Sequence, residues 1–268
     1  MSKLLENKKG IIFGALDKRS IAWKVAEKAH DEGAEFVLSN APIALRMGTI
    51  NELAEKCNTE VIPADATSME DLSKLVDVAT EKYGKLDFVL HSIGMSPNVR
   101  KEKAYTELNH DWFQKTLDIS ALSFHKVIQT LYTKDAMNDW GSILALSYIA
   151  AQEAYPFYSD MADAKSTLES IARSFGYHYG VRNKVRINTI SQSPTVTAAG
   201  SGIAGFDKFF DFAEEMSPLG NADGEACADY CVSMFSDLTR YVTMQNLFHD
   251  GGYSTTGISS KVMERWNK

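Results

Sequence analysis

Residues 10–22 read Gly10-Ile11-Ile12-Phe13-Gly14-Ala15-Leu16-Asp17-Lys18-Arg19-Ser20-Ile21-Ala22. The run from Gly10 to Phe13 is continuously apolar, which is typical of a parallel strand covered on both faces. A turn follows it, and residues 20–30 then have the spacing of an amphipathic helix. A strand, a short turn and a helix in this order begin a βαβ unit, so this stretch predicts an α/β fold with a parallel sheet.

The alternation of strands and helices continues along the rest of the chain. It predicts a Rossmann-like, doubly wound sheet of seven parallel strands with helices on both faces. The predicted strands cover residues 10–13, 36–39, 60–63, 86–91, 142–146, 185–190 and 246–249. The predicted helices cover residues 20–30, 43–56, 69–83, 109–133, 158–179 and 223–236, with Ser68 and Asn109 as N-caps.

Length and composition favour one domain. The chain has 268 residues, of which 44% are hydrophobic and 24% charged, as in ordinary globular proteins. No Ser-, Gly- or charge-rich run separates two periodic regions, so we expect a single domain over residues 1–268. Residues 191–216 break the alternation with many small residues followed by several phenylalanines. We interpret this segment as a mobile loop with helices that covers a substrate.

Charge and hydropathy exclude several classes of partner. The net charge is −7 and no dense cluster of Lys and Arg is present, which argues against a nucleic-acid partner. The N-terminus lacks the apolar core of a signal peptide, and the longest uncharged stretch, residues 187–206, is rich in Ser, Thr and Gly. We therefore expect a cytoplasmic protein with no membrane partner. Cys57, Cys227 and Cys231 have no metal-binding or disulfide spacing, so we expect no metal site.

The turn after the first strand is a candidate cofactor site. Gly14 permits a tight turn, and the helix that begins at Ser20 and Ile21 could hold a pyrophosphate on its N-terminal amides. The pattern departs from G-x-G-x-x-G because Gly14 is its only glycine. The acidic residue expected after the second strand for the adenosine ribose is also replaced, by Ser39-Asn40-Ala41. Arg46 could instead bind a 2′-phosphate or be a surface residue, which leaves NADH and NADPH open.

Further cofactor contacts are expected where other strands end. Asp65 and Ala66 follow the third predicted strand, where the carboxylate could accept a hydrogen bond from adenine or simply close a turn. His91-Ser92-Ile93-Gly94 ends the fourth strand, and Gly94 would let the backbone of Ser92 and Ile93 approach the cofactor. Thr195 and Thr197, after the sixth strand, complete the predicted set.

The most informative segment follows the fifth predicted strand. Tyr148 lies at the end of that strand, and Tyr158 and Lys165 follow in a loop and the start of a helix. Tyr158 and Lys165 lie two helical turns apart, so both side chains can reach one cofactor. Dehydrogenases that interconvert alcohols and ketones carry Tyr-x3-Lys with an upstream Ser. Counted from Lys165, those positions hold Met161 and Tyr148, so this chain departs from that pattern at both.

Tyr-x6-Lys with a second Tyr ten residues upstream resembles the bacterial-type enoyl-[acyl-carrier-protein] reductases, a divergent branch of the short-chain dehydrogenase/reductase superfamily. Similar motifs elsewhere are Gly14 with Ser20-Ile21-Ala22, His91-Ser92-Ile93-Gly94, Ala198-Ala199-Gly200-Ser201-Gly202-Ile203 and His249-Asp250-Gly251-Gly252. Their order and intervals agree from residue 10 to residue 257, so the resemblance covers nearly the whole chain.

The resemblance implies a function in fatty-acid biosynthesis. Hydride would pass from NADH, or less readily NADPH, to C3 of a trans-2-enoyl thioester of acyl carrier protein or coenzyme A, in a homotetramer. Tyr158 is implied to donate a hydrogen bond to the enolate oxygen and Lys165 to hold the nicotinamide ribose. Tyr148 is implied to shape the pocket and assist proton delivery. The implied substrate contacts are Met95, Tyr148, Tyr158, Met161, Ala199, Ile203 and Phe206.

Two other interpretations remain open. An ordinary short-chain dehydrogenase would act on a carbonyl or an alcohol, and the missing Tyr-x3-Lys argues against it. A non-catalytic protein could keep the fold and bind NAD(H) to regulate a partner. The presence of both Tyr158 and Lys165 argues against that interpretation.

Overall fold

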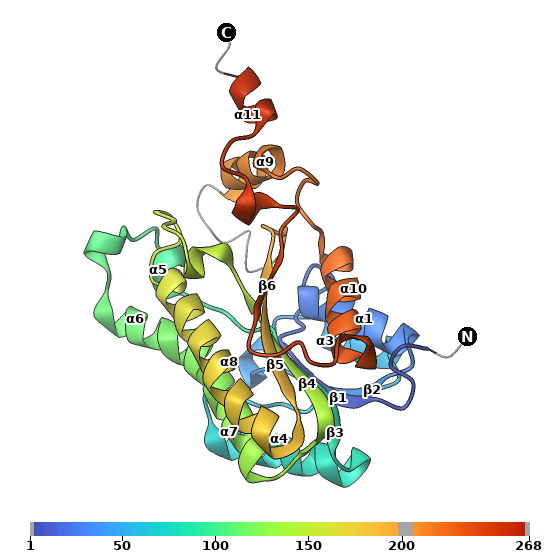
Figure 1. The fold of residues 1–268 in the computed structure, drawn as a ribbon. Helices are drawn as coiled ribbons and strands as arrows, with labels where there is room; N and C mark the ends of the chain where they lie inside the picture. The colour runs from blue at the N-terminus through green and yellow to red at the C-terminus, as the bar shows by residue number, and fades with distance from the viewer. Residues whose placement is uncertain (1–2, 198–205, 266–268) are drawn as a thin grey trace.

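The computed structural model of the chain describes residues 3–197 and 206–265. Its strands form one parallel sheet in the order β2-β1-β3-β4-β5-β6 (Figure 1). The strands are β1 (Lys9–Phe13), β2 (Glu35–Ser39), β3 (Leu86–His91), β4 (Met137–Ser147), β5 (Arg186–Gln192) and β6 (Asn246–His249). The predicted Rossmann-like α/β fold with a parallel sheet is therefore confirmed.

Helices cover both faces of the sheet (Figure 1). They are α1 (Ile21–Asp31), α2 (Pro42–Leu45), α3 (Ile50–Lys56), α4 (Met69–Tyr83), α5 (Pro97–Arg100), α6 (His110–Leu117), α7 (Ser123–Thr133), α8 (Met161–Asn183), α9 (Phe206–Met216), α10 (Gly224–Phe235) and α11 (Ser260–Glu264). Helices α1, α3 and α10 pack on one face, and α4, α7 and α8 pack on the other. Alternate residues of β1 supply the two cores, with Ile12 on the first face and Ile11 and Phe13 on the second.

The prediction of a seventh strand is wrong. In residues 60–63 only Val61 pairs with the sheet, through a single parallel bridge to Leu38 of β2. The amides of Ile62 and Ala64 donate to the carbonyls of Leu38 and Asn40, while the Ile62 carbonyl accepts from the side chain of Ser39, at 2.9 Å from its Oγ. The segment therefore lies along the edge of β2 without becoming a strand, and the sheet has six strands.

Local contacts explain where the helices begin and break. Ser68 and Asn109 accept hydrogen bonds from the amides of Asp71 and Trp112, so both predicted N-caps are confirmed. The helix predicted over residues 43–56 is two helices, α2 and α3. Between them, a Cβ at Gly48 would lie 2.3 Å from the Leu16 carbonyl oxygen, so the chain must bend there to meet the loop after β1. The helix predicted over 109–133 is α6 and α7 joined by a π-helical turn, Asp118–Leu122.

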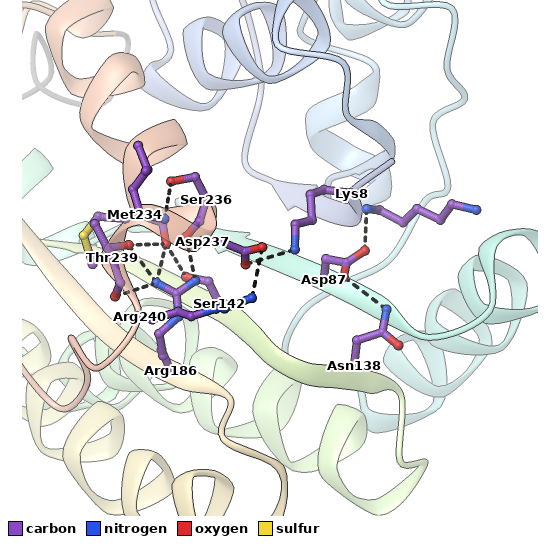
Figure 2. Close-up of polar contacts among 12 residues, drawn as sticks. Lys8, Asp87, Asn138, Ser142, Arg186, Met234, Ser236, Asp237, Thr239 and Arg240 are labelled. Carbon is purple, nitrogen blue, oxygen red and sulfur yellow. Dashed lines mark hydrogen bonds and ion pairs between the residues drawn. The ribbon is translucent and has the colours of Figure 1, made fainter. Parts of the chain in front are cut away.

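A buried arginine joins the sheet to the end of α10 (Figure 2). Arg186, at the start of β5, is 2% exposed. Its guanidinium donates to the carbonyls of Met234, Ser236 and Thr239 at 2.9, 3.2 and 3.1 Å, and to Thr239 Oγ1 at 2.7 Å. Carbonyls at the end of a helix lack partners within the helix and attract cations. Arg186 therefore satisfies the carboxyl end of α10 from within the protein.

Replacing Arg186 with methionine should lower the free energy of unfolding by about 3 kcal/mol, because several buried carbonyls would lose their donor. Urea denaturation followed by circular dichroism measures the change. Arg182→Met is the matched control: Arg182 donates to the Tyr132 carbonyl and Asp135, but its side chain is 36% exposed. A loss of under about 1 kcal/mol is expected there. Equal losses in the two variants would contradict the role of burial.

Candidate active site

A cavity with a volume of about 310 Å³ opens at the carboxyl edge of the sheet, within the size range of ligand sites. It lies between the ends of β3, β4 and β5, the start of α1 and α8, and α9. The predicted site residues that line it are Ser20, Ile21, Ser92, Ile93, Gly94, Met95, Tyr148, Tyr158, Met161, Lys165, Thr195, Thr197 and Phe206. The structure therefore brings most of the predicted site together. Ala199 and Ile203 lie outside the described residues.

The turn after β1 approaches the end of β3 closely. Gly14 has φ +95°, and a Cβ there would lie 1.9 Å from the Ser92 carbonyl oxygen, so only glycine fits. Ser20 precedes α1, but its Oγ accepts hydrogen bonds from the amides of Leu16 and Asp17 at 3.1 and 3.2 Å. Its side chain therefore does not cap α1. The N-terminal amides of this helix, at the cavity wall, are placed to meet an anion instead.

Gly14, Asp65 and Ala66 do not line the cavity. Asp65 Oδ1 accepts hydrogen bonds from the amide and hydroxyl of Thr67 at 2.9 and 2.7 Å, which closes a turn. Ala66 packs into the core beside α4. The sequence left Asp65 as either an adenine contact or a turn residue. The structure shows the turn, and the contact of Asp65 with adenine stays a prediction.

The helix predicted to begin at Tyr158 begins later. Ser159 has φ +48°, a left-handed conformation that cannot continue into a helix, and α8 starts at Met161. Tyr158 lies in the turn before α8, and its carbonyl accepts from the Met161 amide at 3.1 Å. Tyr158 and Lys165 still line one cavity. The two side chains converge as predicted. The cause is the turn before α8, because Tyr158 lies outside the helix and shares no helix face with Lys165.

Lys165 projects from α8 to the end of β4. Its Nζ donates to the Leu146 carbonyl at 2.7 Å, and a Cβ built at Gly94 would lie 3.8 Å from Lys165 Nζ. The residue is 8% exposed. Burial lowers the pKa of Lys165 to about 8, and the negative charge of Glu169 opposes that shift. The ammonium group is thus close to losing its proton under mildly alkaline conditions.

Tyrosines form the opposite wall. The ring of Tyr148 lies 5.0 Å from that of Tyr158 and 5.5 Å from that of Tyr155, measured between centroids. Burial raises the pKa of both Tyr148 and Tyr158 above that of an ordinary phenol. The Tyr148 hydroxyl is buried and has no hydrogen-bond partner among the described residues. Both phenols are therefore neutral near pH 7 and can donate a hydrogen bond to a ligand.

The sequence did not reveal the residues that support these walls. Asp160, fully buried, accepts from Ser96 Oγ at 2.6 Å and from Asn98 Nδ2 at 2.8 Å, which ties α5 to the turn that carries Tyr158. Ser120, in the π-helical turn, accepts from the Met95 amide at 2.9 Å. A single Asp before a helix resembles a solvated cap in the sequence, so only the fold reveals its partners.

Gln192, at the end of β5, is a second support that the sequence did not reveal. Its Nε2 donates to the Ala222 carbonyl at 2.9 Å and to Thr195 Oγ1 at 3.2 Å. Its Oε1 accepts from His249 Nδ1 at 2.7 Å. Gln192 therefore fixes the loop that carries Thr195 to the end of β6. Within residues 3–197 and 206–265, no group of three or more His, Cys, Asp and Glu side chains could hold a metal ion.

Comparison with known proteins decides the family. A sequence model described as "Enoyl-(Acyl carrier protein) reductase" matches residues 14–254. The chain belongs to this enoyl-[acyl-carrier-protein] reductase family. The predicted resemblance is therefore confirmed.

Members of this enoyl-[acyl-carrier-protein] reductase family align with nearly the full length of the chain. Enoyl-[acyl-carrier-protein] reductase [NADH] 2 of Rhizobium meliloti is 32% identical and covers 96% of each chain. The FabI-NADH complex from Alistipes finegoldii has a TM-score of 0.96 and 64% identity over 98% of this chain and 93% of its own. The structure of enoyl-[acyl-carrier-protein] reductase (NADH) from Aquifex aeolicus has a TM-score of 0.87 and 30% identity over 95% of this chain and 99% of its own. No helix in the described part of the chain is long and apolar enough to span a membrane.

Proposed function

We propose that this chain reduces the trans-2 double bond of enoyl thioesters with NADH, as an enoyl-[acyl-carrier-protein] reductase of fatty-acid biosynthesis. The observation that carries the proposal is the convergence of Tyr158, Lys165 and Tyr148 on one cavity that also meets the start of α1. The names of the relatives from Rhizobium meliloti and Aquifex aeolicus, which specify NADH, support the choice of cofactor.

The residues at the carboxyl edge fit a dinucleotide. The first turn of α1, which the Ser20 side chain does not cap, would hold the pyrophosphate beside Ile21 and the Gly14 turn. Gly94 has no side chain to fill the space next to Lys165 Nζ, so a cofactor could approach that atom. Lys165 would then bind the nicotinamide ribose. The remaining proposed cofactor contacts are Asp65, Ala66, Ser92, Ile93, Thr195 and Thr197.

The chain's own groups would stabilise the charge that develops on the substrate. When bound, NADH supplies the hydride that attacks C3 of the enoyl thioester. The neutral phenol of Tyr158 would donate a hydrogen bond to the thioester carbonyl oxygen, which becomes the enolate oxygen. The Lys165 ammonium would add positive charge beside it, and the Tyr148 hydroxyl would help deliver the proton that C2 takes up.

Apolar side chains would bind the acyl chain. Met95, Met161 and Phe206 line the cavity. The terminal methyl group of Met161 lies close to Gly94, 3.9 Å from a Cβ built there. We assign Ala199 and Ile203 to the same channel. The substrate would be carried by acyl carrier protein or coenzyme A, and the chain would act as one domain, in the cytoplasm, within a homotetramer.

The test is an assay of NADH and NADPH oxidation by the purified protein with crotonyl thioesters of acyl carrier protein and coenzyme A. We expect oxidation of NADH that depends on the enoyl thioester and forms the saturated product. Oxidation with ketones but none with enoyl thioesters would favour an ordinary short-chain dehydrogenase. NADH binding without turnover over a series of acyl chain lengths would favour a regulatory protein.

A further inference from the structure

Glu169 is a buried carboxylate one helical turn after Lys165 on α8. It is 4% exposed. Its Oε1 accepts from Ser147 Oγ at 2.6 Å and its Oε2 accepts from Gln152 Nε2 at 3.1 Å. Both carboxylate oxygens therefore accept a hydrogen bond from a neutral donor, and the cation that shares their helix face is Lys165. Burying a charged group costs free energy, so a carboxylate buried near the active-site lysine is expected to interact with that lysine.

Residues four apart on a helix lie on the same face, so Glu169 and Lys165 share the face that meets the end of β4. Ser147, which binds Glu169, stands between Leu146, whose carbonyl accepts from Lys165 Nζ, and Tyr148. The carboxylate therefore holds the strand end that supplies both the acceptor for Lys165 and one wall of the cavity.

The other titratable groups facing Lys165 are neutral near pH 7. His91 faces it from β3; burial, assisted by the positive charge of Lys165, lowers the pKa of His91 to about 3. Tyr148 and Tyr158, in the connection between β4 and α8, line the same cavity as Lys165, and burial raises the pKa of both phenols. Among the residues that the structure describes, Glu169, on α8 itself, is the carboxylate whose negative charge acts on the buried ammonium.

We propose that Glu169 is a positioning residue whose buried negative charge keeps Lys165 in its ammonium form and so sets the upper pH limit of NADH binding. The inference rests on the proposed function, because it needs Lys165 to bind the cofactor.

The sign of the effect follows from the charges. A nearby anion favours the ammonium form, so it opposes the fall in the pKa of Lys165 that burial causes. NADH affinity should be full below the pKa of Lys165 in the free protein and fall as the pH rises through it. Without the carboxylate charge the pKa of Lys165 falls further, and affinity is lost at lower pH.

The experiment measures NADH affinity by fluorescence titration between about pH 6 and about pH 9.5 for the native protein and Glu169→Gln, which keeps the shape but removes the charge. In Glu169→Gln we expect the midpoint of the loss to fall by about one pH unit, so affinity is about threefold below native near pH 9 and unchanged near pH 6. Gln152→Ala is the matched control, because it removes a hydrogen bond to Glu169 and keeps the charge. Its midpoint should stay at the native value.

Two outcomes separate this inference from the proposed function. Absence of NADH binding by the native protein at every pH would contradict the proposed function. NADH binding with the same midpoint in native protein and Glu169→Gln would overturn the role of Glu169 alone. If Glu169→Gln does not fold, Glu169→Ala, which also removes the charge, replaces it: a midpoint lowered by about one pH unit supports the role of the charge, and a native midpoint overturns it.

Discussion

Replacing Tyr158 with phenylalanine is expected to lower kcat for an enoyl thioester by about a hundredfold and to leave NADH affinity within about twofold of native. The ring would keep its place against Tyr148, whose centroid lies 5.0 Å away, so the wall of the cavity would survive. Only the hydroxyl is lost. That hydroxyl is proposed to bind the carbonyl oxygen most tightly once negative charge has developed there, so its removal affects turnover more than binding.

Steady-state kinetics with crotonyl-acyl carrier protein and a fluorescence titration with NADH measure the two quantities for Tyr158→Phe. Tyr177→Phe is the matched control, since Tyr177 lies on α8 and is 62% exposed. The control should keep native kcat. A Tyr158→Phe variant with native kcat would show that another group supports the developing charge, and a large loss of NADH affinity would move Tyr158 to the cofactor site.

The sequence predicted elements whose ends are marked by local chemistry. Helix α4 has the predicted bounds because Ser68 caps its first turn and Gly84, at φ +74°, ends it. Strands β3 and β6 also have their predicted bounds. The failures lie where local contacts override the hydrophobic pattern. The Ser39 hydroxyl donates to the Ile62 carbonyl beside the single bridge at Val61, and the left-handed Ser159 delays α8.

The walls of the site could be predicted and their supports could not. Parallel strands place their carboxyl ends at one edge, so residues that follow those ends, such as Gly94 and Tyr148, line the same cavity. The supports depend on partners far apart in the chain: Asp160 meets Ser96 across 64 positions, and Glu169 meets Ser147 across 22. A lone carboxylate in a sequence is most often at the surface, so nothing in the local pattern indicates that these two are buried.

Replacing Lys165 with alanine is expected to weaken NADH binding roughly thirtyfold near neutral pH, the value of a hydrogen bond to a charged group, and to lower kcat as well. The loss should depend on pH. In the native protein the pKa of Lys165 is lowered to about 8, so affinity falls as the pH rises through that value and the ammonium is lost. In Lys165→Ala there is no ammonium to lose, so affinity should be weak and constant over the same range.

Fluorescence titration of NADH at several pH values checks both parts of the expectation for Lys165→Ala. Arg173→Ala is the matched control, because Arg173 is an exposed cation on the same helix and should leave both affinity and its pH dependence at native values. Native affinity in Lys165→Ala would contradict the ribose contact. Weak affinity that still falls as the pH rises through about 8 would assign the titrating group to another residue, because alanine carries no proton that could be lost.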